Sequence, residues 1–206
     1  MKDKALLFIN GEPPKSFPIL DDYHLIACTD GAFYYLEALN FPLDKLNFIS
    51  GDFDSFLGEN IDSNKLIHTP NQEKTDFQKA LEILLERGIS SVDVYGASGG
   101  EQDHFLGNLT VANRFKDQLE IKFFDEHSTY YFIPNYFELE NGKGRMISLY
   151  PFPKVENLKT NGLKWELHNI NADMSTDMLT RNEAVENKVS IEYEKGNLLI
   201  FIAHSK

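Results

Sequence analysis

The stretch FISGDFDSF, residues 48–56, joins a short apolar run to two aspartates, Asp52 and Asp54. An apolar run that ends in Gly-Asp is typical of a buried strand that carries polar side chains to the edge of a sheet. In extended backbone, residues i and i+2 point to the same face, so we expect the two carboxylates to emerge side by side. Like charges that close need a cation, a proton or open water. The stretch therefore predicts either a solvated turn or a divalent metal site.

Strand-like and helix-like segments alternate on both sides of this stretch, over the first 125 or so residues. The strand-like runs are KALLFING, HLIACTD, LNFISGD, KLIHTP, SVDVYGA and EIKFFDE. Short apolar runs of this kind suit buried strands of a largely parallel sheet. Alternation with helices argues for an α/β domain, and we expect a Rossmann-like, mostly parallel sheet over residues 1–127.

The clearest helix of this region begins at Thr75. Apolar residues follow it at the spacing of one helix face: Phe77, Ala80, Leu81, Leu84 and Leu85. Thr75 and Gln78 form a capping-box pair, and Gly88 is placed as a C-terminal stop. Further helices are expected over AFYYLEAL and from Asp103 to about Phe115.

After about residue 127 the pattern changes to strands alone. The segments TYYFIP, YFELEN, GRMISLYPF, GLKWEL, KVSIEY and NLLIFIA are strand-like, and the last two read as a hairpin joined by a Gly-containing loop. We expect a small all-β sandwich over residues 128–206.

The amino-acid composition excludes some classes of binding partner and indicates a cellular compartment. The net charge is −12, which argues against nucleic acid or an anionic membrane surface as a partner. No run approaches the roughly 20 apolar residues that span a bilayer, and the N-terminal apolar run is too short for a secretory signal. Cys28 is the single cysteine, so no intramolecular disulfide forms. We expect a buried thiol and a cytoplasmic protein.

Acidic residues follow several of the predicted strands. Four such segments stand at a strand end or a helix start. They are Asp30-Gly31, Asp52 with Asp54, residues 71–76, and the glycine turn 96–100 with Asp103 and His104 after it. Singly these features have structural explanations, such as Asp76 near a helix dipole or Asp103 as an N-cap. Together they favour a hard cation such as Mg²⁺ at one sheet edge. The glycine turn is a candidate phosphate cradle.

These motifs, in this order, resemble the thiamine pyrophosphokinase family. The matching positions are Asp30-Gly31, Gly51 to Ser55, Gln72 to Phe77, Gly96 to His104 and Gly162 to Trp165. The resemblance implies pyrophosphoryl transfer from ATP to thiamine, giving thiamine diphosphate and AMP. It also implies an α/β catalytic domain, a β-sandwich domain, and a homodimer with shared sites.

The resemblance also implies roles for particular residues. Asp52, Asp54 and Asp76 would hold Mg²⁺, and Asp30 would lie near thiamine. The nucleotide and phosphate site would comprise Gln72, Thr75, Gly99, Gly100, Asp103 and His104, while Thr180 and Asn182 would touch thiamine. Asp30 or Asp54 would accept the proton of the thiamine hydroxyl, and Asp76 would complete the catalytic set.

The sequence departs from the family pattern at several positions. Glu101 stands where the family's glycine turn carries an arginine, so either Lys74 or Arg181 supplies that charge or ATP binding differs. Arg181 also interrupts the thiamine-touching segment. Ile200 stands where some relatives place a tryptophan, and Trp165 is expected in the core of the β domain.

Two other functions fit parts of the sequence. GASGG at 96–100 matches the nucleophile-elbow pattern, with Ser98 as a hydrolase nucleophile, Asp125 or Asp173 as the acid and His204 as the base. The second alternative function is a module that binds nucleotide or thiamine without catalysis; the departures from the family pattern at Glu101 and Arg181 support it.

Overall fold

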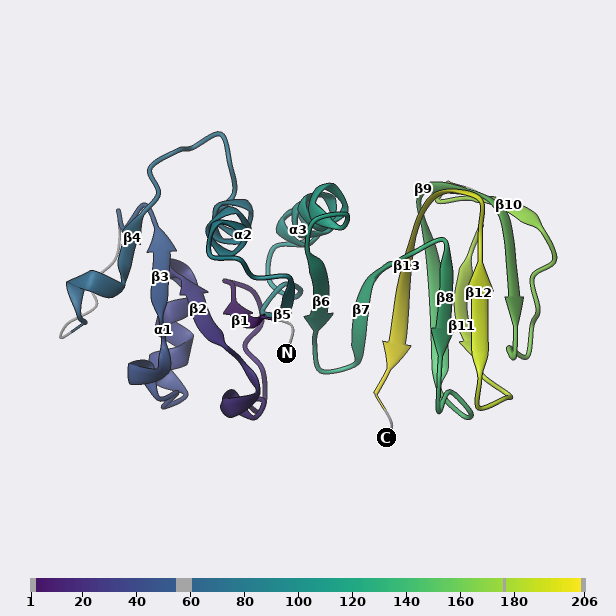
Figure 1. The fold of residues 1–206 in the computed structure, drawn as a ribbon, viewed down its shortest axis with the longest axis horizontal. Coiled ribbons are helices and arrows are strands. Elements are labelled where there is room, and N and C mark those ends of the chain that lie inside the picture. Colours follow the sequence, from purple (N-terminus) through teal and green to yellow (C-terminus); the bar gives the residue numbers. More distant parts are fainter. Residues whose placement is uncertain (1–2, 55–60, 176, 205–206) are drawn as a thin grey trace. The chain divides into compact units, whose positions relative to one another are not determined.

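The computed structural model describes residues 3–54, 61–175 and 177–204. The chain divides into two compact units, Met1–Glu126 and His127–Lys206 (Figure 1). The first unit alternates strands and helices; in the described part of the second, the regular elements are all strands. None of the helices in the described ranges has the length and apolar character needed to cross a membrane.

The strands of the first unit form a parallel sheet in the order β4-β3-β2-β1-β5-β6. They are β1 (Lys4–Phe8), β2 (Leu25–Thr29), β3 (Phe48–Gly51), β4 (Leu66–His68), β5 (Ser91–Tyr95) and β6 (Glu120–Phe124). Each corresponds to one of the six apolar runs of the sequence. The predicted parallel sheet of an α/β unit is therefore confirmed.

Three α-helices and three short 3-10 turns connect these strands in the described ranges. The helices are α1 (Asp30–Ala38), α2 (Asp76–Glu86) and α3 (Gln102–Phe115), and the turns are η1 (Leu20–Asp22), η2 (Leu43–Lys45) and η3 (Ser63–Lys65). Thr75 caps α2 as predicted, its Oγ1 accepting from Gln78 N at 3.2 Å. The Gln78 side chain donates to Glu82 instead of returning to the cap, so only half of the capping box forms.

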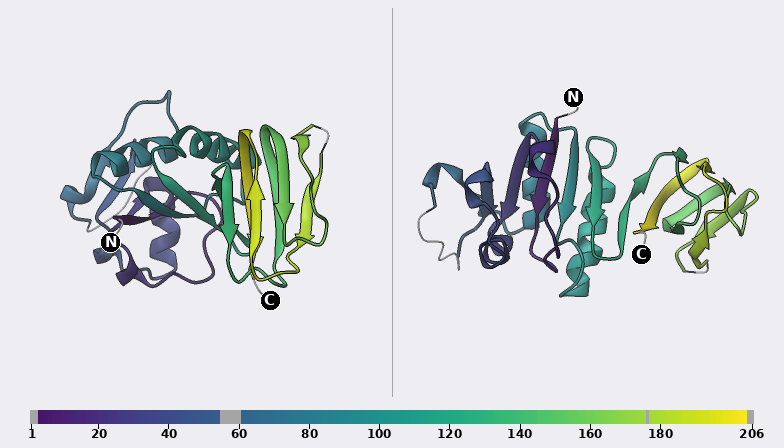
Figure 2. Two further views of the ribbon diagram at one scale, coloured as in Figure 1. Left: turned by 45° about the vertical axis from the view of Figure 1, so that its right-hand side comes forward. Right: turned by 90° about the horizontal axis from the view of Figure 1, so that it is seen from below.

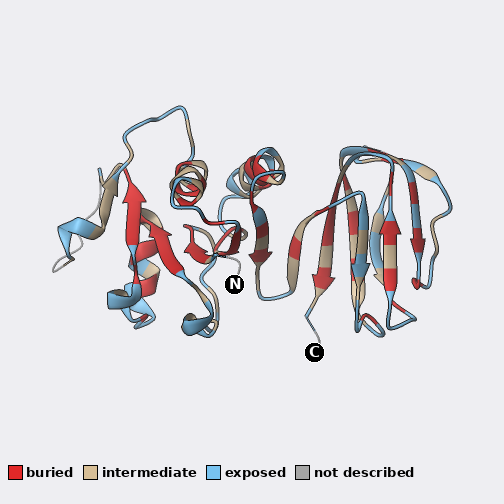
Figure 3. Cartoon of the chain, viewed as in Figure 1, coloured by how far each residue is buried: buried red, intermediate tan, exposed pale blue. Residues whose placement is uncertain are grey.

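Strands β2 and β3 are buried along their whole length and β1 along nearly all of it (Figure 3). Such burial is expected of parallel strands that are covered on both faces. Cys28 belongs to this core, together with Leu6, Phe8, Ile26 and Ile49. The prediction that Cys28 packs as a small buried hydrophobe is confirmed.

Strand β1 lies between β2 and β5, so the order of the strands along the chain reverses at β1. The segments that follow β1 and β5 stay in contact here, since Glu12 N donates to Ser98 O at 2.8 Å. Open α/β sheets bind ligands at the carboxyl ends of their strands, close to such a reversal of strand order.

The second unit is built around one long strand, β9 (Met146–Asn161) (Figure 2). Strand β13 (Lys195–Ala203) pairs with β9 from Ile147 to Glu156. The first part of β9 also pairs with β11 (Leu179–Glu183), and its later part with β10 (Ile170–Asp173) and β12 (Val189–Glu192). Strand β7 (Ser128–Ile133) pairs with β13, and β8 (Tyr136–Leu139) with β12. All of these pairs are antiparallel.

Two expectations for this unit are wrong. GLKWEL, 162–167, is not a strand but a turn after β9; the Glu166 carboxylate holds it by accepting from the backbone N–H of Gly162 and Leu163. Strands β12 and β13 do not form a hairpin, because each pairs with β9 instead. The link between them is held by Asn135, whose amide donates to the carbonyls of Tyr193 and Glu194.

Candidate active site

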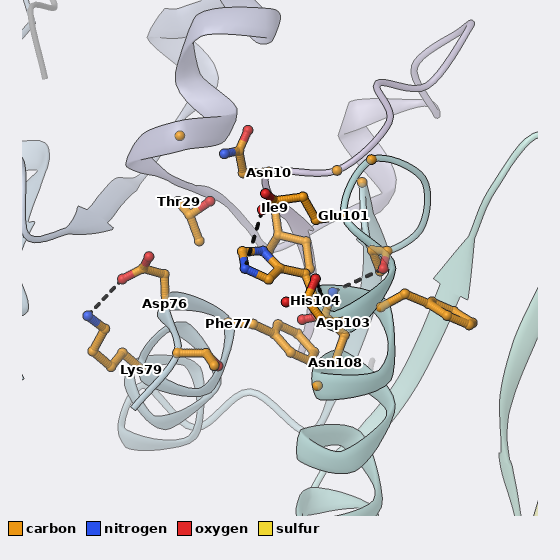
Figure 4. A pocket seen from close by; sticks show the side chains of 18 of the residues that line it. Ile9, Asn10, Thr29, Asp76, Phe77, Lys79, Glu101, Asp103, His104 and Asn108 are labelled. Carbon is orange, nitrogen blue, oxygen red and sulfur yellow. Dashed lines mark hydrogen bonds and ion pairs between the residues drawn. The ribbon is translucent and has the colours of Figure 1, made fainter. Parts of the chain in front are cut away.

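A cleft of about 620 Å³ opens at the carboxyl ends of the parallel strands (Figure 4). Its walls come from the segments that follow β1, β2, β3 and β5 and from the starts of α2 and α3. The predicted site residues that line it are Asp30, Asp52, Gln72, Thr75, Asp76, Gly99, Gly100, Asp103 and His104. The structure thus brings together residues that are more than 70 positions apart in the sequence.

Asp30 is the first residue of α1 and is half-buried in the cleft. Its Oδ1 accepts from Gly31 N at 2.7 Å and its Oδ2 from Phe53 N at 3.2 Å. Burial raises the pKa of Asp30; these two hydrogen bonds oppose the rise, and the charges of Asp76 and Asp52 add to it. The three carboxylates therefore interact electrostatically across the cleft.

A close backbone approach makes room for the Asp30 carboxylate. A Cβ at Gly51 would lie 2.0 Å from Asp30 Oδ2, so only glycine fits at the end of β3. Gly51 of the GDFDS motif is therefore required by the position of a carboxylate that belongs to a different element, helix α1.

Asp52 follows β3 directly and accepts from Gln72 Nε2 at 2.9 Å. This hydrogen bond is the main reason that the pKa of Asp52 is lowered, with a weaker contribution from Asp54 N at 3.2 Å. Gln72 thus further favours the ionised form of Asp52, which is the form that binds a cation.

Asp52 and Asp54 do not emerge side by side. Phe53 between them has φ of 59°, in the left-handed region that bulky residues rarely adopt, so the backbone is not extended here. Asp54 is exposed and is not part of the cleft lining. Ser55, the last residue of the motif, lies outside the described residues. Backbone strain of this kind often marks a functional turn.

Asp76 is the first residue of α2, and its Oδ1 lies 2.7 Å from Lys79 Nζ one turn later. Lys79 is buried, and its ammonium also donates to the carbonyls of Thr69, at 2.8 Å, and Asn71, at 3.4 Å. One lysine therefore fastens the loop that carries Gln72 to the start of the helix that carries Asp76.

The glycine turn between β5 and α3 forms the opposite wall. Gly99 and Gly100 have φ of 77° and 65°, conformations that favour glycine. Asn108 Nδ2 donates to Ala97 O at 3.0 Å and so ties the turn to α3. Glu101 is the N-cap of α3 but makes no side-chain cap hydrogen bond, which differs from the expectation of Asp103 as N-cap.

Three ligand-type side chains gather at the start of α3. The ligand atoms of Glu101, Asp103 and His104 all lie within 4.8 Å of one another, and the three residues are exposed. Within the described ranges no other group of three such residues is that compact; Asp52, Asp54 and Asp76 are farther apart.

The cations that line the cleft are already paired. Lys74 Nζ lies 2.9 Å from both carboxylate oxygens of Glu82, and Lys79 is paired with Asp76. Arg181, the other candidate for the missing arginine, belongs to the second unit. The lysines of the cleft thus bring little uncompensated positive charge to it.

The predicted thiamine residues of the second unit lie in and beside a bulge of β11. Asn182 accepts from Trp165 N at 3.1 Å and donates to Trp165 O at 2.7 Å, while Thr180 is exposed. Trp165 is 58% exposed, so its expected place in the core is wrong. Ile200, in contrast, is fully buried.

The hydrolase alternative gains no support from the geometry. Ser98 Oγ lies 3.5 Å from Asp125 Oδ2, so it faces a carboxylate directly and not the histidine that a triad requires. His204 Nε2 lies 3.1 Å from Thr129 Oγ1.

Sequence reasoning missed several residues that line the cleft, among them Asn10, Thr29 and Lys79. Lys79 had a signal, because a lysine three residues after Asp76 faces the same side of a helix. Asn10 follows a predicted strand, as the aspartates do, but an Asn-Gly pair reads first as a turn.

Comparisons with known proteins agree with these features. Residues 18–123 match the family described as "Thiamin pyrophosphokinase, catalytic domain", and residues 135–198 match "Thiamin pyrophosphokinase, vitamin B1 binding domain". The thiamine pyrophosphokinase of Bacillus subtilis (strain 168) is 26% identical over 212 residues, which cover 96% of this chain and 97% of the relative. Thiamin pyrophosphokinase 1 of Caenorhabditis elegans is 25% identical over 213 residues, covering 95% and 86%.

Solved structures share the fold. Yeast thiamin pyrophosphokinase superimposes with a TM-score of 0.81 at 18% identity, over 98% of this chain and 86% of that one. A thiamin pyrophosphokinase family protein from Enterococcus faecalis gives 0.80 at 23% identity, over 98% and 100%. On the strength of the two family matches and the motifs gathered in the cleft, the chain belongs to the thiamin pyrophosphokinase family.

Proposed function

We propose that the protein transfers the diphosphoryl group of ATP to the hydroxyl of thiamine, giving thiamine diphosphate and AMP. The observation that carries the proposal is the cleft in which Asp30, Asp52 and Asp76 face a glycine turn, in a chain of this family. Carboxylates attract cationic thiamine, and the turn offers backbone N–H groups to phosphates.

The donor set of the cleft fits Mg²⁺. Asp52 and Asp76 offer hard oxygen ligands, and the charges of both raise the pKa of Asp30, so a cation among them relieves repulsion. We assign Asp52 and Asp76 as ligands and keep the exposed Asp54 as a third candidate. Once bound, the ion would neutralise phosphate charge and polarise the transferred group.

Phosphate binding on the opposite wall falls to the backbone. Glu101 replaces the arginine of the family, and both lysines of the cleft are ion-paired. The N–H groups of Gly99, Gly100 and the first turn of α3 are therefore assigned to the phosphates. Gln72, Thr75, Asp103 and His104 complete the nucleotide side in this assignment.

Asp30 is the better candidate for the general base. Its carboxylate lines the cleft and its pKa is raised, which makes it a stronger proton acceptor than an ordinary aspartate. Asp54 is exposed and does not line the cleft. Asp30 would take the proton of the thiamine hydroxyl as its oxygen attacks the β-phosphorus and AMP leaves in line.

We assign residues 1–127 as a Rossmann-like catalytic domain and residues 128–206 as a β-sandwich domain that binds thiamine through Thr180 and Asn182. By the family resemblance we also propose a homodimer with shared sites. Mixing an Asp76→Asn variant with a Thr180→Ala, Asn182→Ala variant tests this, since shared sites restore part of the activity in mixed dimers. We also propose that the protein is cytoplasmic, because ATP is its proposed donor and its single cysteine is a buried free thiol.

One assay tests the proposed reaction. Incubation with thiamine, ATP and Mg²⁺ should yield equal amounts of AMP and thiamine diphosphate, and chelation of the metal should stop the reaction reversibly. Asp76→Asn should lower the rate at least about 100-fold. Binding of thiamine or MgATP without release of AMP would favour the non-catalytic alternative instead.

A further inference from the structure

Asn10 lies two residues beyond the end of β1, the strand at which the strand order reverses. The residue is exposed and lines the cleft (Figure 4). Within the residues that the structure describes, the Asn10 amide has no hydrogen-bond partner. An accessible amide that lines a cleft and bonds nothing in the protein is a candidate for contact with a ligand.

The backbone on either side of Asn10 is fixed by both walls of the cleft. Ile9 O accepts from the Tyr35 hydroxyl of α1 at 3.2 Å, and Glu12 N donates to Ser98 O of the glycine turn at 2.8 Å. The place of Asn10 in the cleft is therefore set without any bond from its own side chain. A donor held in this way needs little reorganisation during a reaction, which is what groups that stabilise a transition state require.

The Asn10 amide lies between the proposed base and the glycine turn. A Cβ at Gly31 would lie 2.6 Å from Asn10 Nδ2 and 2.7 Å from its Cγ, so the amide contacts the residue that follows Asp30. A Cβ at Gly11, the residue after Asn10, would lie 2.6 Å from Ser98 O in the turn. In the proposed reaction the attacking hydroxyl stands at Asp30 and the phosphates at the turn, so the transferred group passes beside Asn10.

The chemistry of the lining favours a phosphate oxygen as the partner. Acceptors for a cation are plentiful in Asp30, Asp52 and Asp76, whereas phosphate oxygens need donors. Apart from Asn10, the side-chain amides and amines of the described lining already donate to protein oxygens; they are Gln72, Lys74, Lys79 and Asn108. The Asn10 amide is the uncommitted donor of this kind, and because it is neutral it does not repel a cation nearby.

We propose that the Asn10 side-chain amide donates a hydrogen bond to a non-bridging oxygen of the phosphoryl group under attack. This rests on the proposed function. As the bond from the thiamine oxygen to phosphorus forms and the bond to AMP breaks, the proton of the hydroxyl goes to Asp30 and Asn10 keeps its own protons. The amide stabilises the charge on the group in transfer, which makes Asn10 a catalytic residue.

A matched set of variants tests the contact. Asn10→Ala removes the donor without adding charge and should lower kcat about 100-fold, the usual effect of losing one such donor, with the KM for thiamine within about twofold of wild type. Asn10→Asp keeps the shape but sets a negative acceptor against the phosphate, so it should lower kcat at least as much and weaken MgATP binding about tenfold. Asn40→Asp adds the same charge at an exposed position beyond the end of α1, outside the cleft lining, and should keep wild-type constants.

The Asn10→Asp variant separates the two substrates as partners. If Asn10 accepted a bond from the cationic acceptor, a carboxylate there would keep the activity and lower the KM for thiamine, and this result would overturn the proposal. Wild-type kcat in Asn10→Ala, or the same defect in Asn40→Asp, would do so as well. Both Asn10 variants should keep the Tm within about 3 °C of wild type, and a kcat loss that appears only with unfolding would assign Asn10 to folding instead.

A binding measurement keeps this contact distinct from the proposed reaction. If the wild type forms no thiamine diphosphate, the proposed function fails. Calorimetric titration of the wild type and Asn10→Asp with inorganic pyrophosphate and Mg²⁺ then still tests the phosphate contact, which fails if the two proteins bind equally or neither binds.

Discussion

Replacing Gly51 with alanine tests whether the end of β3 is shaped around the Asp30 carboxylate. The new Cβ would lie 2.0 Å from Asp30 Oδ2 and 2.1 Å from its Cγ, whereas contacts under 3.0 Å essentially never occur. The carboxylate must therefore move by roughly 1 Å or more, because the other side of the contact is a strand in the core.

This movement should lower the free energy of unfolding and should lower catalytic activity by a larger factor. The hydrogen bonds from Gly31 N, 2.7 Å, and Phe53 N, 3.2 Å, cannot both survive it. We expect Gly51→Ala to lower the free energy of unfolding by about 1–3 kcal/mol, the usual range for overpacking. A displacement of about 1 Å in a catalytic group lowers kcat/KM by about 100-fold.

The assay combines urea denaturation with measurement of AMP release, and a double-mutant cycle supplies the control. In an Asp30→Ala background the clash is absent, so adding Gly51→Ala should change stability by less than about 0.5 kcal/mol. Wild-type activity in Gly51→Ala, or an equal stability loss in both backgrounds, would refute the reasoning that links the two residues.

Three further predictions follow from the hydrogen bonds and charges of the site. Burial raises the pKa of Asp30, so its ionisation costs stability: the cost is absent below the unfolded pKa and grows as pH rises through the folded pKa. Asp30→Asn should therefore be inactive but more stable than wild type to urea at pH 7. This gain in stability should disappear near about pH 3.5. A variant less stable than wild type at pH 7 would contradict the prediction. Gln72→Ala should raise the pKa of Asp52, because the hydrogen bond from Gln72 is the main cause of its lowering. The stability that ionised Asp52 contributes should then be lost at a higher pH on acidification. A ¹³C titration of the Asp52 carboxyl checks this, and an unchanged titration midpoint would count against it. Asn182→Ala removes both hydrogen bonds to the backbone of Trp165, the chain's single tryptophan, and should increase acrylamide quenching of its fluorescence. Unchanged quenching would show that the Glu166 hydrogen bonds hold this turn by themselves.

The sequence by itself determined the elements of the first unit. The strands follow from apolar runs, and the ends of α2 from the cap at Thr75 and the stop at Gly88. Periodicity and capping are local, because residues close in the sequence determine them. The convergence of acidic strand ends also followed, because parallel strands bring their carboxyl ends to one edge.

The tertiary structure decided what depends on distant partners. Phe53 turns the backbone away from the extended form that the Asp52 and Asp54 spacing suggested. Strands β12 and β13 look like a hairpin locally, yet both pair with β9, because pairing is chosen by long-range hydrogen bonding and burial. The hydrogen bonds from Lys79 to the carbonyls of Thr69 and Asn71 were likewise decided by folding, because the sequence spacing indicates only the pairing of Lys79 with Asp76.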